Sequence, residues 1–113
     1  MDDLIAQLKA LGFDSHSEHT QHGVVTIPAF NIELGPYAGR TIALAFAGND
    51  FPKTPPAGLH VQPHLRPLNV KNVSQSPIGP DWQYWSRRLP DWQLDRSGRH
   101  IMSYVRKVLL DEI

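Results

Sequence analysis

The stretch that decides the fold is residues 42–63, IALAFAGNDFPKTPPAGLHVQP. It opens with large apolar residues that alternate with alanine, which is the period of a strand with one face in a core. These large residues are Ile42, Leu44 and Phe46. The alternation resumes at Leu59 and Val61, so the stretch predicts two strands.

A proline-rich segment connects these two predicted strands. Pro52, Pro55 and Pro56 each fix the backbone φ angle and lack an N–H donor, which opposes both helix and central strand. Thr54 and Pro55 each precede a proline, and this favours an extended backbone at both positions. The connection is therefore expected to be stiff.

The preceding residues predict an N-terminal helix and further strands. Residues 2–11 place leucine and isoleucine at helical spacing. Strand patterns cover 23–34 and 40–46, with a glycine-containing turn between them. Pro28 interrupts the first pattern and favours an edge position or a bend. Together with a strand at 58–62, these segments predict an antiparallel meander of three or four strands.

The last segment carries the clearest helix pattern. Asp95 is the predicted N-cap, and apolar residues then recur every three or four positions. We expect this helix to pack on the sheet face formed by the large residues of 42–46. Residues 63–81 show no clear period and predict a long irregular loop. The elements together predict an α+β fold, organised as one domain over residues 1–113.

Composition narrows the classes of function. The 11 basic and 11 acidic residues give a formal net charge of zero, so no global field favours nucleic acid or an anionic membrane. The sequence has no cysteine, which excludes disulfides, thiolate metal sites and thiol nucleophiles. Neither a membrane span nor a signal peptide is recognisable, so we expect a cytoplasmic protein. No phosphate-binding loop or dinucleotide fingerprint is present, and we expect no cofactor.

Three histidines lie close together in the polar stretch 14–22. His16, His19 and His22 are spaced as metal ligands on one helical face would be, but no apolar stripe supports a helix there. A solvated connection or an edge strand is the alternative. We favour that alternative and expect no metal site, because nothing would hold the ligands at metal-binding distances.

All three tryptophans fall within residues 82–92, beside an arginine pair. One interpretation is a recognition patch for a partner protein, formed by Trp82, Arg87 and Arg88. The other is that the tryptophans cover the end of the sheet. We favour packing for Trp85 and Trp92, and the sequence leaves Trp82 open between the two.

Three motifs in this order resemble the ubiquitin-conjugating enzyme (UBC) fold, especially its compact bacterial branch. Residues 35–40, GPYAGR, resemble the family's glycine turn between strands. Residues 50–56, DFPKTPP, resemble its tyrosine-proline and proline-proline signature. Residues 85–87, WSR, with Trp92 before the last helix, resemble the tryptophan that follows the family's active-site loop. The resemblance implies a UBC-like fold over most of the chain.

The chemistry of that family cannot be carried over to this sequence. The family transfers a ubiquitin-like tail through a cysteine thioester, and the corresponding loop, residues 64–84, contains no cysteine. The family's His-Pro-Asn element is also missing, since His64 is followed by Leu65. A chain whose cysteine had been replaced by another residue would look the same.

Two serines in that loop are the candidate catalytic residues. Ser74 and Ser76 lie where a nucleophile would be needed, and either would form an oxyester in place of the thioester. A serine hydroxyl needs an adjacent base to act at neutral pH. Lys71 and His64 are the candidate bases in this stretch.

Three functions follow as hypotheses. The first is a non-catalytic UBC-like protein that binds a ubiquitin-like protein or an activating-enzyme-like protein, as a scaffold component of a bacterial ubiquitin-like conjugation system. The second is an active conjugating enzyme that uses a serine oxyester. The third is an unrelated protein-interaction domain that uses the patch from Trp82 to Arg88. The missing cysteine favours the first.

Overall fold

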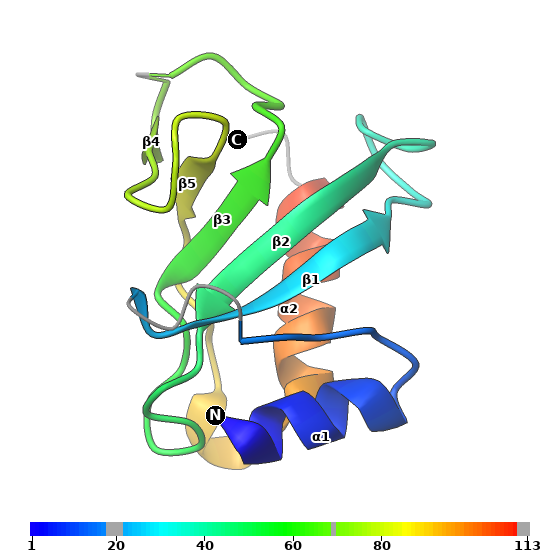
Figure 1. The fold of residues 1–113 in the computed structure, drawn as a ribbon, viewed down its shortest axis with the longest axis vertical. Helices are drawn as coiled ribbons and strands as arrows, with labels where there is room; N and C mark the ends of the chain where they lie inside the picture. The colour runs from blue at the N-terminus through cyan, green and yellow to red at the C-terminus, as the bar shows by residue number, and fades with distance from the viewer. Residues whose placement is uncertain (18–21, 69, 111–113) are drawn as a thin grey trace.

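The computed structural model describes residues 1–17, 22–68 and 70–110. Within these residues, two α-helices, five strands and the short 3-10 helix η2 make up an α+β fold, as predicted (Figure 1). In chain order they are α1 (Asp2–Ala10), β1 (Val24–Asn31), β2 (Thr41–Ala47), β3 (Gly58–Gln62), β4 (Val73–Gln75), β5 (Gln83–Ser86), η2 (Trp92–Leu94) and α2 (Gly98–Leu110).

The five strands form one antiparallel sheet in the order β1-β2-β3-β5-β4. The meander of β1, β2 and β3 confirms the sequence prediction. The predicted count of three or four strands is too low, because β4 and β5 come from residues 73–75 and 83–86. Strands of three and four residues place only one or two side chains on each face, which is too few to establish a period.

The first strand lies at an edge of the sheet and is irregular, as Pro28 predicts. The register between β1 and β2 shifts between Ile27 and Phe30, around Pro28. A bulge at this point accommodates the residue that cannot donate an N–H to a ladder. The prediction of an edge position with a bend is confirmed.

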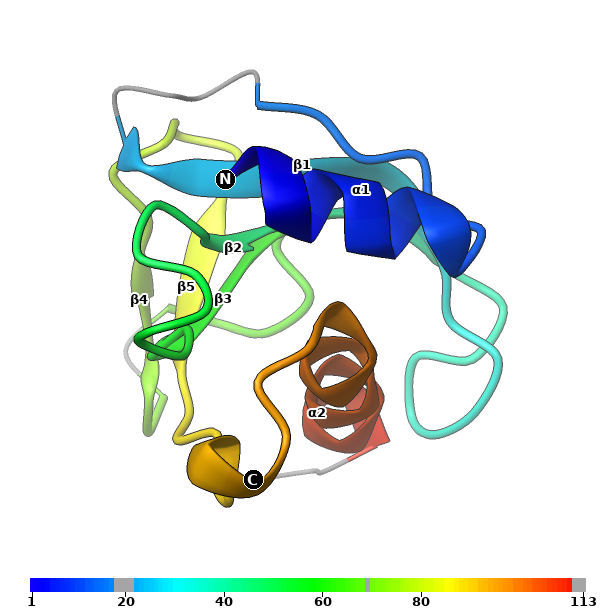
Figure 2. The ribbon, with the colours of Figure 1, turned by 90° about the horizontal axis from the view of Figure 1, so that it is seen from below.

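The sheet curls around α2, which lies inside the curve (Figure 2). Ile42, Leu44 and Phe46 of β2 are buried in one hydrophobic core with side chains of α2. The helix therefore covers the sheet face that the alternation in 42–46 predicts. Those α2 side chains are Ile101, Met102, Tyr104, Val105, Val108 and Leu109.

The start of α2 differs from the prediction. Asp95 has extended backbone, with φ −156° and ψ 99°, and ends η2 instead of capping α2. Ser97 takes the cap position, because its Oγ accepts the His100 N–H at 3.2 Å and its carbonyl accepts the Ile101 N–H. Gln7 Oε1 of α1 accepts the Gly98 N–H at 2.7 Å, and this bond joins the two helices.

The helices of the described residues are all too short or too polar to cross a lipid bilayer.

Candidate functional site

The proline-rich crossing packs against η2 through aromatic side chains. Trp92 Nε1 donates to the Pro52 carbonyl at 2.9 Å, and the Phe51 ring meets the Trp92 ring edge-on at 6.1 Å. Trp92 is only 6% exposed, so its predicted packing role is confirmed. The two contacts hold the crossing beside the residues that follow β5.

A basic groove lies between the crossing and the segment after β5. Its volume is about 850 Å³, and its walls include Pro55, Pro56, Ser86 and Trp92. Four cationic side chains and one aspartate line it, which leaves an excess of three positive charges if all are ionised. The charged residues are Lys53, Arg87, Arg88, Arg96 and Asp91.

Two of the predicted partner-binding residues meet in this groove. Arg88 is exposed, whereas Arg87 is half-buried and its guanidinium carbon lies 6.0 Å from the centre of the Trp85 ring. Arg87 Nη1 donates to the Ser86 carbonyl at 2.9 Å, and the Tyr104 hydroxyl donates to the Arg87 carbonyl at 2.9 Å. Arg87 is therefore a fixed part of the wall, while Arg88 is free to rotate toward a ligand.

The bond from Tyr104 to Arg87 predicts a loss of stability in alkali. Burial raises the pKa of the Tyr104 hydroxyl well above its usual range, and a charged Tyr84 nearby would raise it further. Above the unfolded pKa of about 10, the unfolded chain releases this proton and the folded chain keeps it, so stability falls by about 1.4 kcal/mol per pH unit. Urea titrations between pH 9 and 11.5 measure this slope.

Tyr104→Phe should make that slope shallower than in the unmodified protein. Tyr84 remains in the variant, and burial raises its pKa too, so part of the fall persists. An equal slope in Tyr104→Phe and the unmodified protein would contradict this assignment.

Trp82, the third predicted partner-binding residue, lies elsewhere. It precedes β5 while Arg87 follows it, and it packs against Val24 and Ala45 in a second apolar cluster with 7% of its surface exposed. Ala43 and Ala45 alternate with Ile42, Leu44 and Phe46 along β2, and both lie at this cluster. The hypothesis of an interaction patch from Trp82 to Arg88 therefore lacks the exposed tryptophan on which it depends.

Ser76 is paired with a histidine that the sequence did not single out. Ser76 Oγ lies 2.7 Å from His60 Nδ1 and accepts the Ile78 N–H at 3.1 Å. The two side chains therefore share a hydrogen bond, and the tautomer of His60 decides which of them donates. Ser76 is 3% exposed, and Ser74 is exposed on β4.

The register of the sheet brings His60 to this position. His60 pairs with Tyr84 of β5, and Tyr84 pairs with Ser74 of β4, so these three lie in one row across the sheet, and Ser76 follows Ser74 by two residues. The His60 and Tyr84 rings lie 4.8 Å apart. The sequence signal was the place of His60 between Leu59 and Val61, which directs it to the opposite face.

The two bases considered from the sequence are not paired with either serine in the described contacts. His64 Nε2 lies 3.2 Å from the Trp82 carbonyl oxygen. Lys71 is exposed in the turn before β4. The serine–histidine pair that the structure forms is therefore Ser76 with His60.

Ser76→Ala should lower the free energy of unfolding by about 1–2 kcal/mol, because the half-buried Ile78 N–H loses its acceptor and His60 Nδ1 loses its hydrogen-bond partner. Ser74→Ala, two residues away on the surface, should change it by less than about 0.5 kcal/mol. Urea denaturation of both variants measures the difference. Equal stability of the two variants would show that the Ser76 hydrogen bonds do not stabilise the hairpin.

A buried glutamine anchors the segment that leads into this loop. Gln83 Oε1 accepts the N–H groups of Leu65 and Arg66 at 3.0 and 3.1 Å and the Trp85 indole N–H at 2.8 Å. Gln83 Nε2 donates to the Arg66 carbonyl at 2.8 Å. Trp85 itself is fully buried, as predicted. Nothing in the sequence distinguishes Gln83 from the other glutamines.

The described histidines of the 14–22 stretch do not form a metal site. His16 Nε2 lies 3.1 Å from Asp14 Oδ1, and the His16 backbone forms a bridge with Thr26. His19 lies outside the described residues. Within the described ranges, no three histidine, aspartate or glutamate side chains come together in a metal-binding group.

The fold and the groove define a small α+β protein with a basic surface hollow beside a proline-rich crossing. Comparison of the chain with protein-family models, curated proteins and solved structures finds no match to any of them.

Proposed function

We propose that this chain is a UBC-like protein without conjugating activity, which binds a ubiquitin-like protein or an activating-enzyme-like protein in a bacterial ubiquitin-like conjugation system. The order of α1, the meander, the proline-rich crossing and α2 supports it. The positions of the three sequence motifs also support it: 35–40 lies between β1 and β2, 50–56 lies between β2 and β3, and 85–87 spans the end of β5.

The residues between β3 and β5 support a non-catalytic role. In the UBC family this loop carries the cysteine, and here it carries β4 and a buried Ser76 with its hydroxyl already engaged. The hydroxyl of a residue that is only 3% exposed is poorly placed to meet the end of another protein's tail. Part of this loop is therefore a strand of the sheet, β4.

The single observation that carries the proposal is the basic groove. It is open, has a rigid wall of prolines and tryptophan on one side, and presents Arg88, Arg96 and Lys53 as exposed cations. Exposed arginines beside fixed apolar groups are typical of protein-binding surfaces. The proposed partner therefore places carboxylates over this groove.

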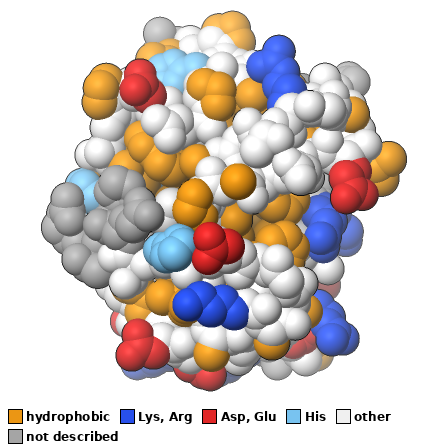
Figure 3. Space-filling view, turned by 45° about the vertical axis from the view of Figure 1, so that its right-hand side comes forward, with side chains coloured by type: hydrophobic (Ala, Val, Ile, Leu, Met, Phe, Trp, Pro, Cys, Tyr) orange, Lys and Arg blue, Asp and Glu red, His pale blue; other side chains and the backbone are white. Residues whose placement is uncertain are grey.

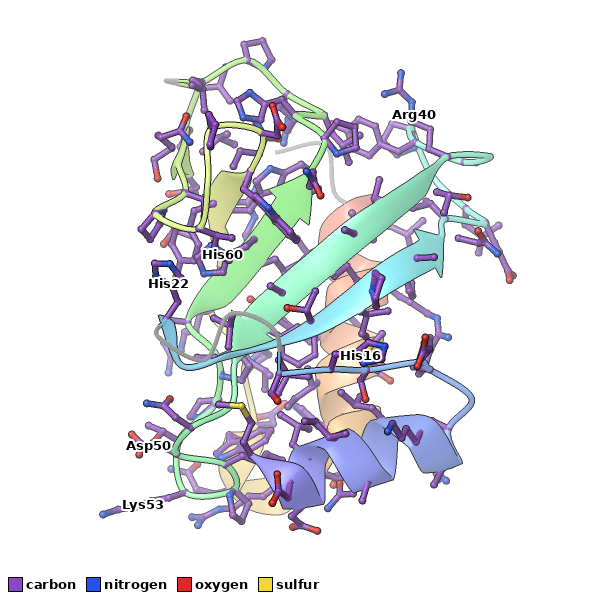
Figure 4. The ribbon with its side chains drawn as sticks, viewed as in Figure 1. His16, His22, Arg40, Asp50, Lys53 and His60 are labelled. Carbon is purple, nitrogen blue, oxygen red and sulfur yellow. The ribbon has the colours of Figure 1, made fainter. Side chains whose placement is uncertain are left out.

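Titration with a ubiquitin-like protein and with an activating-enzyme-like protein tests the proposal. Arg88→Glu/Arg96→Glu should weaken the affinity at least tenfold, which is about 1.4 kcal/mol. Lys9→Glu/Arg40→Glu is the matched control, because it changes the net charge equally away from the groove. Arg40 and the groove residue Lys53 lie at opposite ends of the molecule (Figure 4).

Binding should also weaken as salt is raised from 50 to 300 mM, because the groove is exposed and salt screens its charges. No binding of either protein at 200 µM would remove the proposed function. Equal weakening by both double variants would place the binding surface outside the groove.

The Ser76–His60 pair favours a second candidate, an enzyme that carries the acyl group as an oxyester. His60 Nδ1 would accept the hydroxyl proton as Ser76 Oγ attacks the carboxyl carbon of a tail held on the activating enzyme as a thioester; the C–S bond breaks and the activating enzyme's thiolate leaves. Incubation with an activating enzyme, ATP and a ubiquitin-like protein should then give an adduct that resists thiols and is cleaved by hydroxide. Ser76→Ala should abolish the adduct and Ser74→Ala should not; an adduct that survives Ser76→Ala would exclude this candidate.

A further inference from the structure

The second half of β1 leaves one edge of the sheet open. The first half is covered, since His16 and Thr26 exchange two backbone hydrogen bonds of 2.8 Å on its outer side. Beyond the bulge at Pro28, no backbone group of the described residues bonds to the outer side of β1. An unpaired strand edge is a template for another strand.

The backbone of Asn31, the last residue of β1, points away from the sheet. Ile32 points inward, because its N–H donates to the Arg40 carbonyl at 2.9 Å and its carbonyl accepts the Gly39 N–H at 2.8 Å. Successive residues of an antiparallel strand direct their N–H and C=O groups to opposite sides. Asn31 therefore offers one donor and one acceptor to solvent.

A pocket of about 270 Å³ adjoins this edge, between β1 and the end of α2. Phe13, Phe30 and Ile32 contribute apolar walls, and Leu34 and Leu110 stand at the rim with 69% and 45% of their surface exposed. Hydrophobic side chains reach the surface on this side of the molecule, with cationic ones beside them (Figure 3). The volume suits a large apolar side chain of a peptide.

Arg106 supplies the positive charge of this pocket. Its guanidinium carbon lies 5.6 Å from the centre of the Phe13 ring, which holds the side chain at the pocket wall. Glu33 lines the other part of the pocket, two residues after the end of β1. A bound chain is therefore favoured when its carboxylate lies toward α2 and away from the strand.

We infer that the outer edge of the sheet at the end of β1, at Asn31, binds an extended segment of a partner protein as a sixth strand. The segment inserts one large apolar side chain between Phe13 and Leu110 and sets a carboxylate against Arg106. Main-chain hydrogen bonds supply affinity in this mode, and the pocket supplies specificity. This surface shares no residue with the basic groove, so the inference does not rest on the proposed function.

An oriented library of eight-residue peptides, with phenylalanine fixed and glutamate two positions later, tests the inference. Selected peptides should bind the full chain with a dissociation constant below 1 mM and shift the amide resonances of Asn31 and Glu33. N-methylation of the peptide at alternate amides should weaken binding at least tenfold when it removes a donor to β1. Failure to enrich any sequence, or shifts confined to other residues, would overturn the inference.

Two variants separate the parts of the surface. Arg106→Glu should reverse the preference from glutamate to lysine at the second fixed position, and Arg99→Glu on the same helix should not. Leu34→Asp, at an exposed position, should weaken binding at least fivefold while the protein stays folded.

Arg88→Glu/Arg96→Glu should leave peptide binding unchanged, which distinguishes a failure here from a failure of the groove. Self-association on size-exclusion chromatography that competes with the peptide would replace the partner by a second copy and overturn the inference as stated.

Discussion

Gln83→Met should lower the free energy of unfolding by about 4 kcal/mol, the largest effect that we expect from a single substitution. Methionine fills a similar volume but leaves three N–H groups and one carbonyl without their partner. The Trp85 indole N–H contributes the largest part of this loss in stability, because Trp85 is fully buried and water does not reach it. An unsatisfied buried donor costs about 1–3 kcal/mol, and the half-buried Leu65 and Arg66 recover part of their loss in water.

Equilibrium unfolding in urea measures this effect. Gln93→Met is the control, because Gln93 is exposed on η2 and should change stability by less than about 0.5 kcal/mol. Trp85 fluorescence and the resonances of residues 64–66 should change in Gln83→Met even where the protein remains folded. A loss below about 1 kcal/mol would mean that the amide network does not hold this loop.

Gly58→Ala should cost about 3 kcal/mol, because a methyl group at this position has no space. A Cβ at Gly58 would overlap the Trp85 carbonyl oxygen and the Tyr84 side chain, which lies across β3. The first of these is backbone, so relief requires β3 and β5 to separate where Gly58 pairs with Ser86. The next residue along, Arg87, donates its N–H to the Ala57 carbonyl at 3.2 Å.

The substitution should therefore distort the groove as well as the sheet, since Ala57, Ser86 and Arg87 line the groove. Gly58→Ala should weaken partner binding together with stability, both measured on the same preparation. Gly79→Ala is the matched control, because a Cβ there meets Trp82 Cδ1 at an ordinary 3.4 Å and the backbone is not left-handed. A Gly58→Ala protein as stable as Gly79→Ala would contradict the close approach of the two strands.

The sequence predicts the middle of the sheet and the helix that covers it, but it does not predict the strands β4 and β5 at one edge. The alternation of Ile42, Leu44 and Phe46 predicts β2 and the face that α2 covers, because three consecutive large residues on one face define a period. β4 and β5 have no such run, and their pairing depends on the sheet already formed by β3. The sequence predicts Asp95 as the N-cap, but Ser97 caps α2, because Asp95 lies at the end of η2 and residue type alone does not show where the helical backbone begins.

The candidate site is likewise predicted only in part from the sequence. Arg87 and Arg88 stand out by residue type, and both line the groove. Trp82 carries the same sequence signal, but the alanines of β2 leave room for it on the far face of the sheet. The pairing of Ser76 with His60 joins residues on either side of β4 in the chain, so it depends on the order β3-β5-β4 and has no local signature.

The position of α2 matters while the protein is being synthesised. This helix lies inside the curved sheet (Figure 2), and its first residue, Gly98, bonds to Gln7 of α1. The ridge of Ile42, Leu44 and Phe46 is complete once β3 has emerged from the ribosome, but its cover is made of residues 98–110. A nascent chain therefore shows an uncovered apolar ridge while some fifty further residues are translated. Interaction of this intermediate with a chaperone should end abruptly when α2 leaves the exit tunnel.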